Sequence, residues 1–212
     1  ALGKGNNAAI KEPIEPVALP EALAAPEPAP TASTEAAAYL LRATAVSFVA
    51  GKDYRTTEHL TVRMLTAAGV ERFSTLHFDL DPRYERAYLN QLRVLDESGA
   101  VVSKGSADDC YLSDQASEEL GTSLRALDVP VPGLKVGCTL ELTLTRRALD
   151  PHRPDFRRHF LAAGLPVLKS VYYLEGDLKA VRHHASPGVT PQPSGRGLAW
   201  VVKAPPVYKS EP

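Results

Sequence analysis

The segment formed by residues 131–145 constrains the fold of this 212-residue chain more than any other segment. It starts with the pair Pro132-Gly133, passes Gly137, and then alternates leucine with polar residues. Glycine and proline pairs are typical of turns, and a period of two is typical of an antiparallel strand with one buried face. The segment therefore predicts a turn followed by a half-buried strand. It indicates an architecture rather than a chemistry.

The same alternation of apolar and polar residues recurs along most of the chain. It is present at residues 60–64, 76–80, 89–95, 167–174, 178–182 and 198–202. Turn signals separate such runs about every 8 to 14 residues, which predicts about eight or nine short strands. We therefore expect an all-β chain folded as an antiparallel β-sandwich, with a polar surface loop and a short helix at residues 103–128.

Residues 1–36 differ from the rest in composition. Large apolar side chains are few among the alanines and glutamates, and the prolines are Pro13, Pro16, Pro20, Pro26, Pro28 and Pro30. Proline fixes φ and cannot sustain a helix or a ladder, and a segment with little apolar surface has little to bury. We expect a disordered linker or tail over residues 1–36 and a folded β-sandwich domain over residues 37–212.

Charge and hydropathy exclude two classes of partner. Lys plus Arg number 24 and Asp plus Glu number 25, so no basic excess is available to bind nucleic acid. The longest apolar run, residues 36–50, is interrupted by Arg42, Thr44 and Ser47, so we expect no membrane span. The chain starts without Met and without a basic-then-apolar leader, which leaves open a cytoplasmic protein or a chain cut downstream of a targeting segment.

The two cysteines, Cys110 and Cys138, leave two interpretations open. They form a disulfide in an oxidising compartment, or they are two separate buried thiols. Cys110 follows Asp108 and Asp109, and these like charges are expected to raise the pKa of its thiol, the reverse of what a nucleophile needs. We expect no catalytic residue, no metal ion and no cofactor in this chain.

Two groups of residues are weak candidates for ligand binding. The arginines could pair with carboxylates or phosphate, or they belong to an ordinary solvated loop. The tyrosines could stack on a sugar or a peptide, or they pack in the core or lie scattered on the surface. The candidates are Arg146, Arg147, Arg153, Arg157, Arg158, Tyr84, Tyr88 and Tyr111.

Five segments, taken in order, resemble a known family. They are residues 56–69, 92–101, 129–141 and 160–173, and Trp200 followed by Pro205-Pro206. Together they resemble the bacterial domain of unknown function 3857, which is found upstream of transglutaminase-like domains, over residues 38–212. The resemblance implies an immunoglobulin-like β-sandwich and an extracytoplasmic location, either periplasmic or secreted. It also implies that a papain-like Cys-His-Asp core follows in the full-length protein.

The resemblance and the residues together lead to one functional hypothesis. We expect a non-catalytic accessory domain of a transglutaminase-like bacterial protein, which scaffolds the neighbouring domain or presents substrate to it. The alternative is an independent module that binds a peptide or a carbohydrate. The expected partners are the adjacent transglutaminase-like domain and a peptide or glycan ligand. The chain itself is not expected to be an enzyme.

Overall fold

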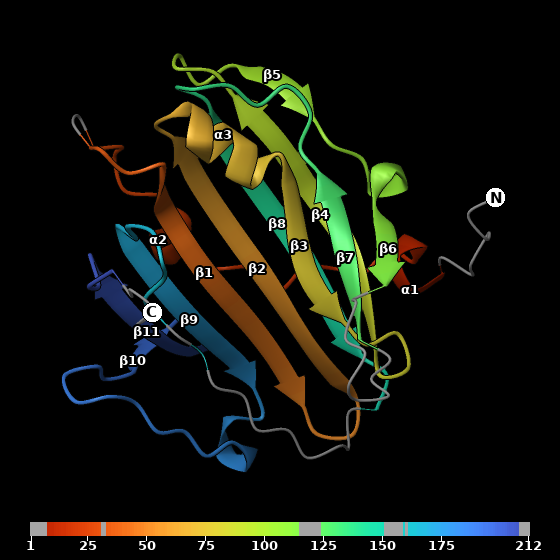
Figure 1. Cartoon of the computed structure of the whole chain (residues 1–212). Helices are drawn as coiled ribbons and strands as arrows, with labels where there is room; N and C mark the ends of the chain where they lie inside the picture. Colours follow the sequence, from red (N-terminus) through yellow and green to blue (C-terminus); the bar gives the residue numbers. More distant parts are fainter. Residues whose placement is uncertain (1–7, 31–32, 115–123, 151–158, 160, 208–212) are drawn as a thin grey trace.

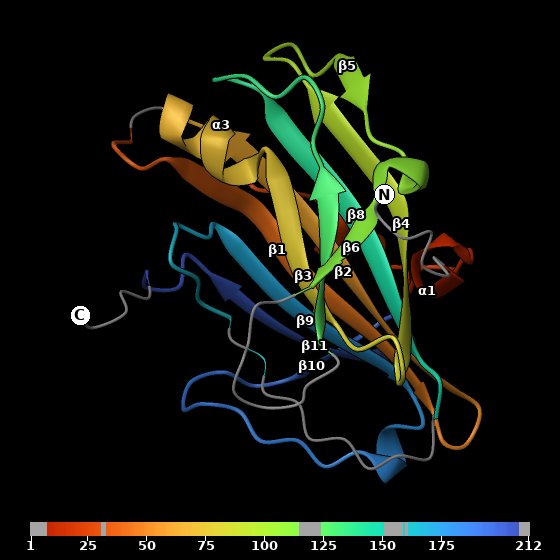
Figure 2. The ribbon, with the colours of Figure 1, turned by 45° about the vertical axis from the view of Figure 1, so that its right-hand side comes forward.

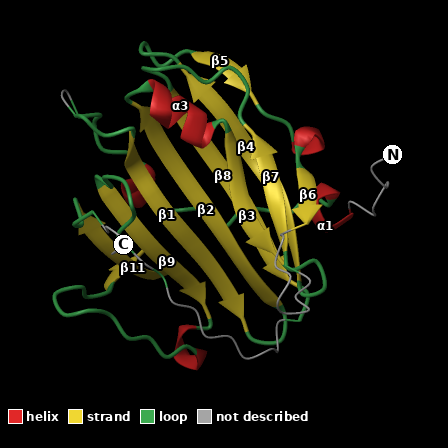
Figure 3. Ribbon diagram, in the orientation of Figure 1, coloured by secondary structure: helices red, strands yellow, loops and turns green. Residues whose placement is uncertain are grey.

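The computed structural model describes residues 8–30, 33–114, 124–150, 159 and 161–207. These residues form two β-sheets, which Figures 1 and 3 show as curved layers with a few short helices at their edges. The strands are β1 (Ala37–Val49), β2 (Asp53–Met64), β3 (Thr75–Leu80), β4 (Glu85–Leu95), β5 (Val101–Lys104), β6 (Tyr111–Asp114), β7 (Arg125–Pro130), β8 (Thr139–Ala148), β9 (Lys169–Gly176), β10 (Gln192–Ser194) and β11 (Gly197–Lys203). The α-helices are α1 (Ala8–Lys11), α2 (Glu21–Ala24) and α3 (Ala67–Phe73), and the 3₁₀ turns are Ala107–Asp109 and Leu178–Ala180.

The large sheet has eight strands in the order β10-β11-β9-β1-β2-β8-β4-β5, and the small sheet has three in the order β3-β7-β6. The prediction of a mostly β fold is confirmed. The prediction of purely antiparallel pairing is wrong in one place, because β1 pairs with β9 in parallel from Arg42↔Ser170 to Phe48↔Gly176. These strands are more than a hundred residues apart, so no local turn signal reports their relative direction. An immunoglobulin-like strand order is not established by this topology.

The turn and strand predicted from residues 131–145 are present. Gly133 and Gly137 have φ of 73° and 83°, in the left-handed region that favours glycine. The chain then enters β8, where Leu140, Leu142 and Leu144 alternate with polar residues and are almost fully buried. All three leucines face the same side of the large sheet because successive residues of a strand point to opposite faces.

The small sheet packs over this side of β2, β8 and β4 (Figure 2). Leu80 and Leu127 on the small sheet share one apolar core with Leu140 and Val94 on the large sheet. Helix α3 lies at one end of the layers (Figure 1). It starts after Thr66, whose side chain accepts a hydrogen bond from the Gly69 N–H and so caps the helix. The protein therefore has two packed β-layers around one main core.

Residues 103–128 were expected to form a polar surface loop with a short helix, but the described part of this stretch is largely strand. This stretch contains the end of β5, a 3₁₀ turn, and β6, and it enters β7. Strands β5 and β6 have four residues each, too few to show a period of two clearly. Residues 115–123 lie outside the described residues.

The N-terminal segment is the largest correction to the sequence-based prediction. Residues 8–30, called the N-terminal strap below, are packed against the protein rather than disordered. Ile10 enters the main core beside β4, whereas Val17 and Leu23 pack on the opposite face of the large sheet. Figure 2 shows α1 beside β4, and Figure 1 shows α2 behind β1. A few well-spaced apolar side chains suffice because the sheet already supplies the rest of the core.

Side chains of the large sheet hold the strap by its main chain. Asn90 Nδ2 donates to the Ile14 carbonyl at 2.6 Å, and Arg55 Nη1 donates to the Glu15 carbonyl at 2.8 Å. The Val17 N–H donates to Thr57 Oγ1 at 2.8 Å. Main-chain contacts of this kind tolerate proline and alanine in the strap, so its composition gave no signal of this packing.

No helix in the described part of the chain is long and apolar enough to cross a membrane.

The strap predicts a measurable contribution to stability. Ile14 is 3% exposed, so Ile14→Ala is expected to lower the free energy of unfolding by about 2–5 kcal/mol through the lost burial and the remaining cavity. Glu15→Ala, at an exposed neighbouring side chain, is expected to change it by less than about 0.5 kcal/mol. Urea unfolding measures both. Equal, small effects would show that the strap does not contribute to the fold.

Candidate functional site

A polar pocket lies on the inner face of the large sheet, next to the end of β3. Its volume is about 120 Å³. Four neighbouring strands, β9, β1, β2 and β8, supply most of its lining, and His159 supplies the rest. The lining residues are Thr44, Val46, Thr56, Glu58, Arg146, His159 and Tyr172. Polar side chains predominate, unlike in the apolar core beside the pocket.

The strand register brings these side chains together. Thr44 of β1 lies opposite Glu58 of β2 and beside Tyr172 of β9. Thr56 of β2 lies opposite Arg146 of β8. Residues two apart on a strand share a face, so the polar residues of β2 and β8 continue the row of apolar residues that forms the core. The pocket begins where that row changes from apolar to polar.

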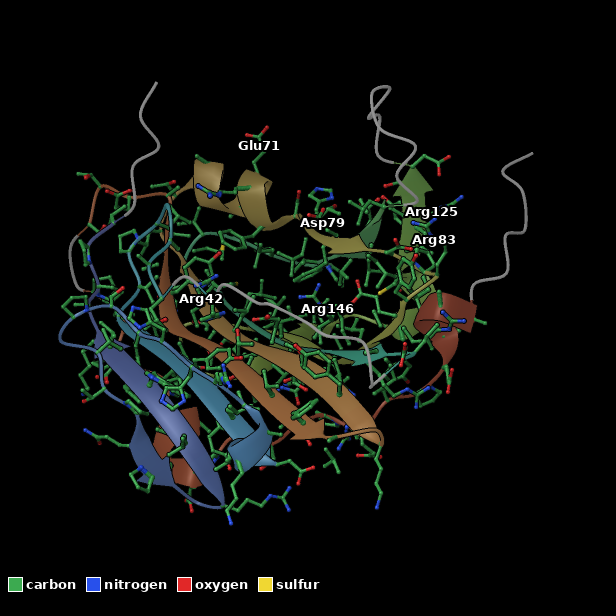
Figure 4. The ribbon with its side chains drawn as sticks, turned by 90° about the horizontal axis from the view of Figure 1, so that it is seen from below. Arg42, Glu71, Asp79, Arg83, Arg125 and Arg146 are labelled. Atoms are coloured by element: carbon green, nitrogen blue, oxygen red, sulfur yellow. The ribbon has the colours of Figure 1, made fainter. Side chains whose placement is uncertain are left out.

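One carboxylate and one guanidinium face each other across the pocket without a close ion pair. Thr44 Oγ1 donates to Glu58 Oε2 at 2.8 Å. Arg146 Nη2 lies 4.0 Å from Glu58 Oε1, and Arg146 Nη1 donates to the Asp79 carbonyl at 3.3 Å. Figure 4 shows Arg42 and Arg146 on the side of the large sheet that faces α3 and β3. Arg146 and Glu58 are therefore the two oppositely charged side chains of the lining, and Arg42 lies on the same side of the sheet.

Two buried nitrogen atoms of the pocket residues have no hydrogen-bond partner within the described part of the protein. They are Arg146 Nε and His159 Nε2. The His159 ring lies against the Tyr172 ring with 4.9 Å between centroids. Burial is the main cause that lowers the pKa of His159 to about 4, and the positive charge of Arg42 contributes to the same shift. His159 is therefore a neutral imidazole at pH 7.

A comparison with family models places the chain. Residues 52–205 match the family described as a domain of unknown function with a solved structure, DUF3857. The chain belongs to this family. The family resemblance predicted from the sequence is thereby confirmed. Five of the seven residues that line the pocket lie within the matched residues of this DUF3857 domain, and the other two, Thr44 and Val46 of β1, precede them.

Solved structures show the same fold in a longer protein. A crystal structure described as that of a "putative protease" from Parabacteroides distasonis ATCC 8503 is similar, with a TM-score of 0.67 and 14% identity. The similarity covers 83% of this chain and 37% of that chain, so this DUF3857 domain spans well under half of the longer protein. Yeast LTA4 hydrolase in complex with bestatin is less similar, with a TM-score of 0.41 at 13% identity over 84% of this chain and 30% of that chain. No curated protein matches.

The arginines proposed from the sequence do not form one surface in the described structure. Arg146 faces the pocket, whereas Arg147 lies on the opposite face of β8 and pairs with Glu12 of the strap at 2.7 Å. Adjacent residues of a strand point to opposite faces, so Arg146 and Arg147 do not belong to one cluster. Arg153, Arg157 and Arg158 lie outside the described residues.

The tyrosines proposed from the sequence are spread over different elements. Tyr84 is exposed in the turn between β3 and β4, with the Arg83 guanidinium 5.1 Å from its ring centroid. Tyr88 lies on β4 opposite Thr145, on the face of the large sheet that holds the strap. Tyr111 is exposed at the start of β6, on the small sheet. The large sheet therefore separates Tyr88 from Tyr111, so the three tyrosines do not form a single stacking surface.

Both cysteines are free and buried. Burial is the largest cause that raises the pKa of the Cys110 thiol, to about 11, and the charges of Asp109 and Asp108 add to it. The sequence indicated the direction of this shift but attributed it to the two carboxylates. Burial matters more because a thiolate loses its hydration there.

A second polar cluster lies across the small sheet. Ser113 Oγ donates to Asp128 Oδ2 at 2.6 Å, and His77 Nδ1 lies 2.5 Å from Asp128 Oδ1. Asp128 is buried and both of its carboxylate oxygens have partners. This cluster joins β6, β7 and β3, and both carboxylate oxygens of Asp128 have a partner within it. We therefore assign it a structural role, which is to connect the three strands of the small sheet.

Sequence reasoning missed most of the pocket. Thr44 and Glu58 gave no motif although they face each other within one hairpin, and Tyr172 comes from β9, which is far from both in the chain. One signal was present in β2, where the alternate positions change from the apolar Leu60 and Val62 to the polar Glu58 and Thr56. Such a change within one strand face indicates where an apolar core ends.

The environment of Cys110 predicts slow alkylation. With a pKa near 11, the folded thiol has a thiolate fraction about a hundredfold lower than an ordinary cysteine at pH 8. Iodoacetamide labelling, followed by peptide mapping, is expected to modify Cys110 about a hundredfold more slowly in the folded chain than in urea. Equal rates in the two states would contradict the buried thiol.

The depressed pKa of His159 predicts a loss of stability in acid. Between pH 6.5 and about 4 the unfolded chain binds a proton at this residue that the folded chain does not, so stability falls as pH falls. The contribution lost is about 3 kcal/mol. His159→Phe keeps a ring beside Tyr172 but cannot ionise, so its unfolding free energy should depend less on pH over this window.

Urea unfolding at pH 7 and pH 4.5 measures this difference. His184→Gln, at an exposed histidine, is the control and should keep the pH dependence of the unaltered chain. A residual dependence is expected in every variant, because burial also lowers the pKa of His59. An unchanged dependence in His159→Phe would show that His159 is not buried in its neutral form.

Proposed function

We propose that this chain is a non-catalytic accessory domain of a longer bacterial protein, in which it scaffolds a transglutaminase-like domain or presents substrate to it. One observation carries the proposal. The similarity to the Parabacteroides distasonis protein covers 83% of this chain but only 37% of that chain, which is described as a "putative protease". The same fold therefore occurs as one part of a longer protein.

The environment of the thiols supports a non-catalytic role. A nucleophilic cysteine needs a lowered pKa and a base within hydrogen-bond distance. Burial raises the pKa of Cys110 to about 11, and its Sγ donates to the Ser106 carbonyl at 3.6 Å. Both features favour the neutral thiol, which is a weak nucleophile.

An extracytoplasmic location, periplasmic or secreted, belongs to the same proposal and rests on the family resemblance. Fractionation of the native cells with an antibody against this chain tests it. The proposal expects the protein in the periplasmic or culture fraction. Recovery with the cytoplasmic proteins would overturn the location.

The alternative, an independent module that binds peptide or carbohydrate, is favoured by the polar pocket. The pocket is lined by polar side chains that include Glu58 and Arg146, and a few polar groups in a cavity are typical of a ligand site. The two functions are compatible in a domain that presents substrate, but only the accessory role requires a catalytic neighbour.

The accessory role is tested on the native gene product. Intact mass and peptide mapping establish whether a Cys-His-Asp core is present in the same polypeptide. Where it is, removal of this domain should lower the kcat/KM of that core for a peptide substrate by about tenfold or more, through lost positioning. The purified 212-residue chain should have no such activity.

The control is the full-length protein with its core cysteine replaced by serine, which should be inactive with this domain present. A native protein that ends with this domain would overturn the accessory role. So would a core whose kcat/KM is the same with and without the domain.

A further inference from the structure

The N-terminal strap crosses the face of the large sheet that points away from the small sheet, called the strap face below. All eight strands of the large sheet pair with one another, and none of the described residues 8–30 belongs to a strand. A main-chain hydrogen bond joins the strap to β1, from the Glu27 N–H to the Leu40 carbonyl at 3.1 Å. The strap therefore lies on a completed sheet, in the way that a bound peptide lies on its receptor.

The strap face holds the strap by its main-chain carbonyl groups. Four side chains of the sheet donate hydrogen bonds to five of these carbonyls. The donors are Asn90 of β4, Arg55 and His59 of β2 and Lys169 of β9, and the acceptors are the carbonyls of Ile14, Glu15, Val17, Ala22 and Ala25, at distances of 2.6–3.3 Å. Because a carbonyl oxygen only accepts, the ring nitrogen of His59 is the donor in its contact. Carbonyl groups are common to all residues, so these contacts select an extended chain rather than particular side chains.

The order of these contacts shows the path of the strap. Ile14 is bound from β4, Val17 from β2 and Ala25 from β9. In the sheet these strands lie in the order β9-β1-β2-β8-β4. The strap therefore crosses five neighbouring strands, and the donors are spread over this whole width.

Apolar side chains of the strap add selectivity to the main-chain contacts. Val17 and Leu23 are 2% and 9% exposed, and they share an apolar cluster with Ala43, Ala45 and Ala199 of the sheet. These alanines are small, so the strap face has room for a larger apolar side chain of the crossing segment. Ligands of this face are therefore distinguished by the spacing of a few apolar residues.

Proline suits a site that binds carbonyl groups. The strap contains Pro13, Pro16, Pro20, Pro26 and Pro28. Proline has no N–H to satisfy, and its fixed φ favours an extended backbone before binding. A proline-containing segment therefore loses less conformational entropy when it binds, which raises its affinity.

We propose that the strap face is a binding site for an extended, proline-containing peptide with apolar residues at the spacing of Ile14, Val17 and Leu23, and that the strap is its intramolecular ligand. A segment of this kind in another polypeptide competes with the strap for the same donors. The tether gives the strap an effective concentration in the millimolar range, so it limits access to the site. The inference goes beyond the accessory role and does not depend on it, because every contact lies within this chain.

The experiment replaces the strap by a peptide of the same sequence. A protease recognition sequence is inserted between residues 31 and 32 of the 212-residue chain, and its cleavage turns the strap into a free ligand. A dye-labelled synthetic peptide with the sequence of residues 8–30 is then added, and fluorescence anisotropy measures its uptake. The cleaved chain is expected to bind the peptide and to saturate. The uncleaved chain should bind it at least about tenfold more weakly, because its tethered strap competes.

Substitutions in the peptide test the apolar contacts and leave the protein unaltered. Val17→Asp and Leu23→Asp each place a charge against the apolar cluster, and should weaken binding about tenfold or more. Glu15→Ala and Ala18→Ser, at exposed side chains, are the matched controls. Both control peptides should bind within about twofold of the unaltered peptide.

One substitution in the protein tests the recognition of carbonyl groups. Lys169→Met removes the donor to two carbonyls but keeps an unbranched side chain, and should weaken the peptide about tenfold. Lys179→Met, at an exposed lysine of the second 3₁₀ turn, is the matched control and should leave the affinity unchanged. If Lys169→Met fails to fold, the peptide series decides the question.

Four outcomes overturn the proposal. A cleaved chain that takes up no labelled peptide, or that unfolds when the strap leaves, would show that the strap is an inseparable part of the fold. Equal binding by the cleaved and uncleaved chains would place the peptide elsewhere on the protein. Equal binding of the Val17→Asp peptide would exclude the apolar contacts. None of these results bears on the accessory role, which is measured on the native gene product.

Discussion

The burial of three leucines on β8 is the interaction on which the rest of the structure depends. Leu140, Leu142 and Leu144 face the small sheet and form the centre of the main core. Their alternation fixes which face of the large sheet is covered, because a shift by one residue would turn all three to the other side. Two positions after Leu144, the same face carries Arg146, so the edge of this core is also the wall of the pocket.

The opposite face of the large sheet carries an apolar cluster and, beside it, a series of hydrogen bonds that extends into the strap. Thr145 Oγ1 donates to Asn90 Oδ1, and Thr57 and Thr145 are joined at 2.9 Å, while Asn90 and Thr57 both bind the main chain of the strap. Each buried hydroxyl in this chain of contacts has a partner. On the strap face these hydroxyl groups are hydrogen-bonded within the protein. On the pocket face, Arg146 Nε and His159 Nε2 have no such partner among the described residues.

The parts of the fold that follow from neighbouring residues were predictable, and the parts that join distant residues were not. The turn at Gly133 and Gly137 and the strand after it followed from local pattern, as did the direction in which the pKa of Cys110 is shifted. The parallel pairing of β1 with β9 did not, because it depends on the path of the whole chain. Arg146 was a candidate from the sequence, but its partner Glu58 became visible only through the register of β2 and β8.

The central position of β1 has a consequence for where this domain can be divided. β1 lies between β2 and β9, so it joins the β2-β8-β4 half of the large sheet to the β9-β11 half. The family match starts at residue 52, after β1 ends at Val49. Similarity of sequence and integrity of the sheet therefore have different boundaries in this protein. A polypeptide limited to the matched residues would lack the strand that connects the two halves, and would expose an unpaired edge on each.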